Sequence, residues 1–297
     1  MENYLSECRL CPRECKADRI KAKTGYCKAG AEIKIARAAL HYWEEPPISG
    51  TRGSGAVFFS YCNLGCVFCQ NYKISKEHCG KIVSETELAK IFLDLQKQGS
   101  HNINLVTPTH YIPQIATALK HAKNDGLCIP VVYNCGGYES AEALKLLDGL
   151  IDIYMPDVKY YDDKYAIKYS NAPHYFEHAK KALAQMYRQV GKPVFDADKI
   201  MKKGMIVRHM MLPGLLFDSK KILDYLHSEY KNNIYISIMN QYTPMPTVVK
   251  YPEINKRVDE KYYNTLVNYA QRLGIENAFI QSGEAVGEEF IPEFSDR

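Results

Sequence analysis

The feature that most constrains this chain is an alternation of short apolar runs with longer amphipathic segments, which begins at Gly53. Strands are expected at 56–59, 103–106, 129–133, 151–155, 205–212 and 234–239. Helices are expected between and after them, at 112–123, 140–147, 219–230 and 259–273, with a longer helical region up to about Val190. Strands that alternate with helices pair in parallel through right-handed crossovers. The sequence therefore predicts an α/β fold of about six strand–helix units, either a full or partial barrel or a doubly wound sheet.

One more helix is marked by its first residues. Ser84 and Glu87 have the spacing of a capping box, in which each side chain bonds the backbone N–H of the other residue. Apolar residues at helical spacing follow, namely Leu88, Ile91, Phe92 and Leu95. A helix beginning after Ser84 is therefore expected.

The charge is mild. Thirty-eight basic and 34 acidic residues give a formal net charge of +4, and no long basic run is present. This argues against a nucleic-acid partner. No run approaches the roughly 18 apolar residues of a spanning helix, and residues 1–10 lack the apolar core of a signal peptide. We therefore expect a soluble cytoplasmic protein without a membrane partner.

Ten cysteines need an explanation in that compartment, where thiols stay reduced. Seven of them fall into two groups, one within residues 8–27 and one within residues 62–69; their members are Cys8, Cys11, Cys15 and Cys27, and Cys62, Cys66 and Cys69. Two thiolate sites follow. Residues 1–50 are expected to be a cysteine-rich metal-binding segment that ends in an extended turn or linker at 44–50, and residues 51–297 the barrel domain.

The second cysteine group follows the first core strand directly, with the spacing C-x3-C-x2-C. Three thiolates on a short loop can hold three irons of a [4Fe–4S] cluster and leave the fourth open. One alternative is structural zinc with Cys79 as the fourth ligand. Another is a closed four-cysteine cluster for electron transfer.

The pattern C-x3-C-x-aromatic-C, placed after the first strand, resembles the radical S-adenosylmethionine (SAM) superfamily across roughly residues 54–281. The resemblance implies a partial (β/α)6-type barrel with a small N-terminal Cys-rich appendage. It implies that Cys62, Cys66 and Cys69 hold a catalytic [4Fe–4S] cluster, and that Phe68 lies near the adenine of SAM. Reductive cleavage of SAM would give a 5′-deoxyadenosyl radical that abstracts hydrogen from a substrate.

A closer resemblance is to a branch of pyruvate formate-lyase activating enzyme-like proteins that begins with a cysteine-rich segment. The stretches that carry it are residues 8–13, 44–50 and 208–214. It implies a glycyl-radical enzyme as partner, whose glycine would lose the hydrogen, and an electron donor such as flavodoxin or ferredoxin. The alternatives are a radical SAM enzyme acting on a small molecule, peptide or other protein, and a protein without enzymatic activity, either an iron–sulfur electron carrier or a zinc-stabilised binding module.

Further site residues are sought at strand ends, because ligands of parallel α/β barrels bind there. Asp157 and Lys159 share one face of their strand by its period of two, and the resembling enzymes carry an Asp-x-Lys near SAM and substrate. The candidates for SAM contacts are Thr107, Thr109, Asn134, Lys159, His209 and Gln241. The family's Gly-Gly-Glu is absent near Thr107, and no histidine occurs near Gln241. For each candidate, a purely local structural role is the alternative.

The N-terminal cysteines offer four thiols within about twenty residues. A closed tetrahedral zinc site would replace the core that such a short segment lacks. An auxiliary iron–sulfur cluster is the alternative, since it would suit electron delivery.

Overall fold

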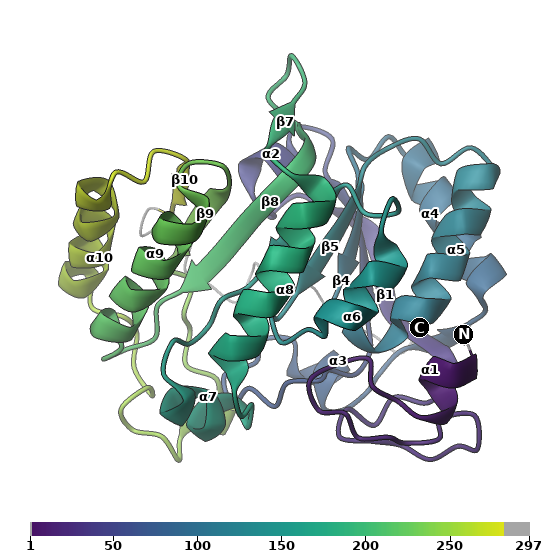
Figure 1. Cartoon of the computed structure of the whole chain (residues 1–297), viewed down its shortest axis with the longest axis horizontal. Helices are drawn as coiled ribbons and strands as arrows, with labels where there is room; N and C mark the ends of the chain where they lie inside the picture. Colours follow the sequence, from purple (N-terminus) through teal and green to yellow (C-terminus); the bar gives the residue numbers. More distant parts are fainter. Residues whose placement is uncertain (1, 282–297) are drawn as a thin grey trace.

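A computed structural model describes residues 2–281, and a ten-stranded sheet organises this part of the chain (Figure 1). The strand order is β10-β9-β8-β6-β5-β4-β2-β1-β3, with β7 paired to β8. Seven strands run parallel: β2 (Ser54–Phe59), β4 (Ile103–Val106), β5 (Val131–Cys135), β6 (Ile153–Pro156), β8 (Met201–Met210), β9 (Tyr235–Met239) and β10 (Ala278–Ile280). The antiparallel strands are β1 (Ile33–His41), β3 (Lys81–Val83) and β7 (Val194–Phe195).

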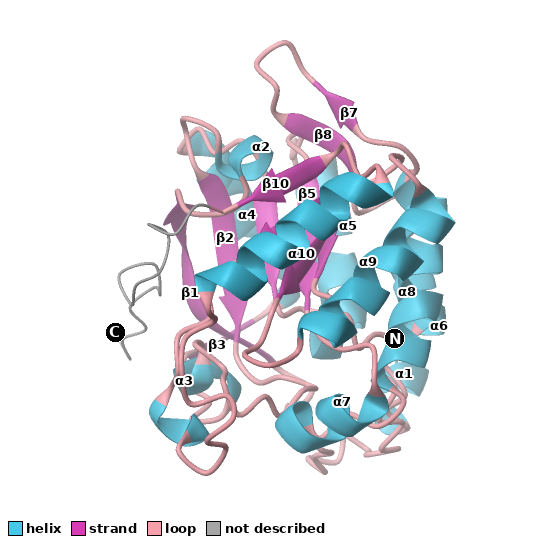
Figure 2. Cartoon of the chain, turned by 90° about the vertical axis from the view of Figure 1, so that its left-hand side faces the viewer, coloured by secondary structure: helices cyan, strands magenta, loops and turns pink. Residues whose placement is uncertain are grey.

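The major helices cover one face of this sheet (Figures 1 and 2). They are α4 (Glu85–Lys97), α5 (Ile112–Asn124), α6 (Ala141–Leu144), α8 (Tyr175–Val190), α9 (Leu216–Tyr230) and α10 (Glu260–Leu273). The parallel strands follow one another in chain order without a reversal. Right-handed crossovers then place every helix on the same face, whereas a doubly wound sheet needs a reversal. The fold is therefore a partial (β/α) barrel, as the resemblance implied.

Shorter helices join these elements. They are α1 (Glu2–Ser6), α2 (Pro46–Ser49), α3 (Tyr72–Ser75), α7 (Asp163–Ser170) and the 3₁₀ turns Thr109–Tyr111, Lys145–Leu147 and Pro246–Val248. Helices α3 and α7 and the N-terminal loops lie at the end of the barrel to which the parallel strands point, whereas α2 lies at the opposite end (Figure 1). No helix within residues 2–281 is long and apolar enough to cross a membrane.

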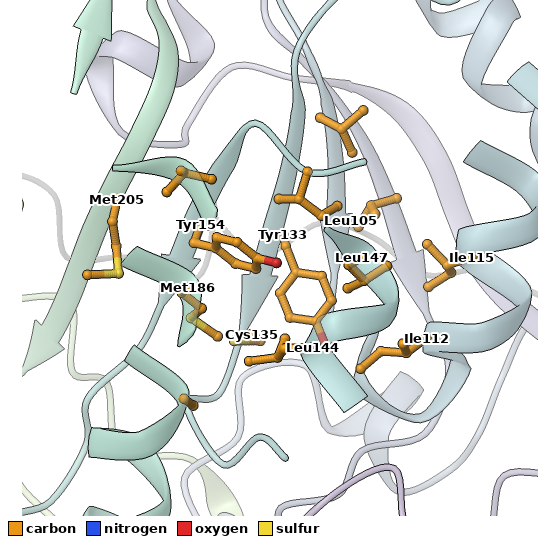
Figure 3. Close-up of a cluster of buried hydrophobic side chains, with 14 of the residues drawn as sticks. Leu105, Ile112, Ile115, Tyr133, Cys135, Leu144, Leu147, Tyr154, Met186 and Met205 are labelled. Carbon is orange, nitrogen blue, oxygen red and sulfur yellow. The ribbon is translucent and has the colours of Figure 1, made fainter. Parts of the chain in front are cut away.

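Two cores result from the alternation of side chains along the strands. Tyr133 and Tyr154 point outward from β5 and β6 and are buried against the helices, together with Leu144 (Figure 3). Their neighbours Val132 and Ile153 point into the barrel and are buried there. Strands buried on both faces appear in the sequence as continuous apolar runs. Such runs are what located these strands in the sequence.

The expectation of an extended turn or linker at residues 44–50 was wrong for most of this stretch. Pro46–Ser49 forms helix α2, and Ile48 is fully buried in the barrel interior. The Asn102 Nδ2 donates a 2.7 Å hydrogen bond to the carbonyl of Ile48. Proline fixes φ near its helical value, so Pro46 favours the helix start, and the apolar Ile48 closes the bottom of the barrel.

Other boundaries differ where local patterns were ambiguous. Strand β1 was not expected, since only Ile33 and Ile35 alternate inward before small and charged residues follow. The long helical region divides into α7 and α8, because Asn171 ends α7 in the left-handed conformation (φ 47°) and Pro173 follows. The capping box at Ser84 and Glu87 is confirmed at the start of α4.

Candidate active site

A cavity of about 760 Å³ opens among the carboxyl ends of the parallel strands. Its walls come from the loop after β2 and from the ends of β5, β6 and β8. Residues 41–46, which run from the end of β1 to the start of α2, line the same cavity. A cavity of this size suits a small-molecule ligand or cofactor.

The three cysteines of the C-x3-C-x2-C loop all line this cavity. Cys66 is buried, and Cys62 and Cys69 are half-buried. The N–H of Leu64 donates to Cys62 Sγ at 3.4 Å, and the Ser170 hydroxyl donates to Cys66 Sγ at 2.9 Å. The loop thus presents three thiols to one space, as the spacing predicted.

Burial raises the pKa of the Cys62 thiol, and the neighbouring Cys66 and Cys69 raise it further. Burial also raises the pKa of Cys66, although the ammonium group of Lys159 opposes this. Thiolates crowded in a buried site need a cation to stabilise their charge. A metal-containing cluster supplies that cation, so this set of soft donors fits iron–sulfur ligation.

The loop is held by the C-terminal end of α7. The Gly65 N–H donates to the carbonyl of Ser170 at 3.1 Å, and the Val67 N–H donates to that of Tyr169 at 2.8 Å. A Cβ on Gly65 would collide with the Tyr26 hydroxyl of the N-terminal segment. Glycine at position 65 therefore permits three parts of the chain to meet at the loop.

Arg208 forms the centre of a charged group on the cavity wall. Its guanidinium donates to Asp157 Oδ1 at 2.8 Å, to Asn134 Oδ1 at 2.7 Å and to Glu44 Oε2 at 3.2 Å. Lys159 Nζ donates to Asp157 Oδ2 at 2.6 Å. The side chains of four strand ends or loops thereby form one connected network.

The charges of this network stabilise one another. Burial would raise the pKa of Asp157, but the nearby Arg208 and Lys159 outweigh it and lower that pKa. Burial would lower the pKa of Lys159, but Asp157 outweighs it and raises that pKa. Asp157, Lys159 and Arg208 are consequently all ionised near neutral pH.

Several expected SAM contacts do line the cavity. They are Phe68, Thr107, Asn134, Lys159 and Gln241. The Phe68 ring packs edge-on against Tyr242, with 5.9 Å between the ring centroids. The carbonyl of Gln241 accepts a 3.2 Å hydrogen bond from Gln70. Thr107 has φ 60°, which lies in the left-handed region.

Two expected contacts are not brought to the cavity. Thr109 is buried, and its hydroxyl donates to Glu139 at 2.8 Å. His209 is buried as well, with Nδ1 2.7 Å from the carbonyl of Val158. Adjacent strand residues face opposite sides, so Arg208 points inward and His209 does not.

Sequence reasoning missed Glu44 and Arg208 as site residues. The position of Arg208 near the end of a strand indicated a site residue. The sequence did not determine whether Arg208 or its neighbour His209 points into the cavity. Glu44 stands before the Pro46-Pro47 pair, whose helical conformation brings the preceding loop into the cavity. The position of Glu44 in the cavity depends on packing between residues far apart in the sequence, which the periodicity of a single segment does not show.

A buried carboxyl lies behind the cavity wall. Glu139 accepts hydrogen bonds from the Thr109 and Tyr133 hydroxyls, at 2.8 and 2.9 Å. Burial raises its pKa to about 7, although these bonds act in the opposite direction. Its charge in turn contributes to the raised pKa of Cys11 in the N-terminal segment. Glu139 is therefore close enough to the N-terminal segment for its charge to act on Cys11.

The N-terminal cysteines do not line the cavity. Cys8 and Cys11 are buried, Cys27 is half-buried and Cys15 is exposed. In this arrangement, no three His, Cys, Asp or Glu side chains of residues 2–281 are grouped for a single metal ion. The segment packs against the cysteine loop, since the Arg13 guanidinium donates to the carbonyl of Asn63 at 3.0 Å and stacks on Tyr26, 3.6 Å from its ring centroid.

Fold and site together define a partial α/β barrel with a thiol-lined cavity at its strand ends. The family model of the radical SAM superfamily matches residues 56–226, more than half of the chain, and the chain belongs to this superfamily. Membership implies an enzyme that uses a [4Fe–4S] cluster and SAM, and the three thiols described above fit such a cluster.

The relatives are consistent with this assignment. The uncharacterised protein MJ0674 of Methanocaldococcus jannaschii is 27% identical over 285 residues, which cover 93% of this chain and 77% of the relative. SuiB of Streptococcus suis bound to SAM is 13% identical with a TM-score of 0.52, over 74% of this chain and 48% of SuiB. SuiB bound to its precursor peptide SuiA is 12% identical with a TM-score of 0.51, over 74% and 46% of the two chains.

This chain spans about half the length of the SuiB structures. At such identities the likeness shows the fold alone. A domain of a pyruvate-formate lyase-activating enzyme from Bacteroides vulgatus is also similar, with 14% identity and a TM-score of 0.43 over 58% of this chain and 92% of that domain. That score is too low to distinguish one branch of the superfamily from another.

Proposed function

We propose that Cys62, Cys66 and Cys69 hold a [4Fe–4S] cluster whose fourth iron faces the cavity and binds SAM. The observation that carries this proposal is that all three thiols line one cavity that also contains ionised Asp157, Lys159 and Arg208. Bound together, cluster and SAM supply a 5′-deoxyadenosyl radical that abstracts hydrogen from a substrate.

The residues of the cavity wall would hold SAM in place. The ammonium group of Lys159 acts on the neighbouring Cys66 thiol, whose pKa it lowers against the effect of burial, so Lys159 is suited to the SAM carboxylate. Asn134 faces the same space and could bind the carboxylate or the ribose hydroxyls. Phe68 offers an aromatic ring for the adenine, and Thr107 and Gln241 offer polar groups. Asp157 and Arg208 keep these groups charged and oriented.

For the substrate, we propose the glycine of a partner glycyl-radical enzyme, with flavodoxin or ferredoxin as electron donor. The N-terminal cysteine segment and the stretches 44–50 and 208–214 support this by resemblance. A second candidate is another small-molecule, peptide or protein substrate. Thr107 stands where the family commonly has Gly-Gly-Glu, and Gln241 lies where activating enzymes often have histidine, which favours this second candidate.

We further propose that Cys8, Cys11, Cys15 and Cys27 bind zinc or an auxiliary iron–sulfur cluster. Burial and the charges of Cys27 and Cys8 raise the pKa of Cys11, which shows that these thiols influence one another. Metal binding would draw the four thiols together and stabilise a segment with a small core. Metal analysis and visible absorption of a Cys62, Cys66 and Cys69 triple alanine variant would distinguish zinc from a second cluster.

The test of the proposed function is reductive SAM cleavage. Anaerobically reconstituted protein should form 5′-deoxyadenosine when reduced, and the Cys66→Ala variant should not. An electron carrier or binding module would give no SAM-dependent product in either protein. Adding a glycyl-radical enzyme from the same genome and recording a glycyl radical by electron paramagnetic resonance would distinguish the two substrate classes.

A further inference from the structure

A buried hydroxyl donates to one of the three cysteines. The Ser170 Oγ–H donates to Cys66 Sγ at 2.9 Å, and Tyr160 OH lies 2.7 Å from Ser170 Oγ. A serine hydroxyl carries one proton, so a serine that donates to sulfur must accept from the tyrosine. The two residues therefore form a directed chain, from Tyr160 through Ser170 to Cys66.

The chain is shielded from solvent and fixed in position. Ser170 and Tyr160 are both fully buried. The Ser170 carbonyl accepts the Gly65 N–H of the cysteine loop, so the same residue contacts the loop through backbone and side chain. The Tyr160 ring packs edge-on against Tyr175, with 5.5 Å between centroids. In this low-dielectric setting a hydrogen bond to a charged sulfur is strong.

Within residues 2–281, the other two cysteines have no equivalent donor chain. Cys69 Sγ lies 3.3 Å from the hydroxyl of Ser75, which is only half-buried. Cys62 accepts a backbone N–H at 3.4 Å. Of the three contacts, the one to Cys66 Sγ is the shortest. Its donor, the Ser170 hydroxyl, is fully buried, whereas that of Ser75 is not.

Hydrogen bonds to ligand sulfurs stabilise the added negative charge of a reduced cluster and so raise its reduction potential. We propose that Tyr160 and Ser170 are positioning residues that raise the reduction potential of the cluster held by Cys66. This inference rests on the proposed function, because it presupposes that Cys66 is a cluster ligand.

The test is a redox titration of the reconstituted protein, followed by electron paramagnetic resonance. Ser170→Ala should shift the midpoint to a more negative potential. The expected size is about a tenfold lower ratio of reduced to oxidised cluster at a given potential, or about 59 mV for one electron. Tyr160→Phe should shift it in the same direction by less, and Ser170→Thr, which keeps a hydroxyl, should stay near the wild type.

Ser219→Ala is the matched control, since Ser219 is buried in α9 and its hydroxyl has no hydrogen-bond partner in the part of the chain that the structure describes. Its midpoint should equal that of the wild type. Equal midpoints in wild type, Ser170→Ala and Tyr160→Phe at equal iron content would overturn the inference but leave the proposed function standing. If Ser170→Ala fails to retain iron, Tyr160→Phe decides alone. A wild type that holds no [4Fe–4S] cluster would contradict both.

Discussion

The two cysteine groups of this chain differ in what they face. Cys62, Cys66 and Cys69 line a cavity of about 760 Å³, whereas Cys8, Cys11, Cys15 and Cys27 lie outside it. The first group follows a core strand whose carboxyl end points to the cavity. The second belongs to a segment that packs behind the first, through Arg13 on Asn63 and Tyr26 near Gly65. If the proposed roles hold, the same residue type serves chemistry beside an open cavity and stability in a packed segment.

The sharpest way to break this comparison is to remove one cysteine from each group. Cys66→Ala should lower reductive SAM cleavage by at least about 100-fold, because a cluster with two remaining thiolates is not retained. Cys11→Ala should keep the catalytic iron. The measurement is iron content and 5′-deoxyadenosine formed per protein. Equal loss of cavity iron in both variants would show that the two groups form one site.

Loss of the metal proposed for the N-terminal cysteines should instead affect folding. Cys8→Ser or Cys11→Ser should lower the free energy of unfolding by about 3 kcal/mol or more, since loss of a metal is among the few changes that destabilise a protein strongly. Urea unfolding measures this, with Cys128→Ser as control because Cys128 is an exposed cysteine outside both groups. Unchanged stability in both N-terminal variants would contradict a structural role for this segment.

Buried Glu139, whose charge acts on Cys11 of the N-terminal group, predicts a pH dependence of stability. Its pKa is raised from 4.5 to about 7, so between these values the folded protein binds more protons than the unfolded chain. The stability contributed by protonated Glu139 is present near pH 4.5 and is lost as the pH rises through 7, by about 3 kcal/mol in total.

Glu139→Gln should remove this dependence, because the amide stays neutral at every pH. Comparing urea unfolding of wild type and variant at pH 5 and pH 8 isolates the contribution of Glu139. A difference between the two proteins that stays the same at both pH values would show that the carboxyl does not titrate with a raised pKa.

The smallest expected effect concerns the charged cavity wall. Arg208→Gln should lower SAM cleavage about thirtyfold, or about 2 kcal/mol, since Asp157 and Glu44 lose their shared cation. Iron content should not change. His209→Gln is the matched control, as this neighbour points away from the cavity, and its activity should stay within about threefold of wild type. Equal losses would mean that Arg208 acts only through local structure.

Some residues of the cavity could be predicted from the sequence and others could not, for physical reasons. The loop that brings three cysteines to the cavity could be predicted because these cysteines lie within eight residues and follow a strand whose apolar run is visible. Asp157 and Lys159 were predicted because the strand period fixes their shared face. His209 was chosen instead of Arg208 because the strand is buried on both faces. The local sequence therefore does not show which of two adjacent residues points into the barrel. Glu44 was missed because helix α2 and Ile48, through packing across the barrel, place it in the cavity.

The central claim is that three thiols hold a cluster with one open iron in the cavity. The most direct measurement is the low-temperature electron paramagnetic resonance spectrum of the reduced protein, before and after SAM is added. The account predicts about four irons bound through Cys62, Cys66 and Cys69, and a spectrum that changes when SAM binds. The absence of any cluster signal that responds to saturating SAM, or a SAM-responsive signal that persists in the Cys66→Ala variant, would contradict it.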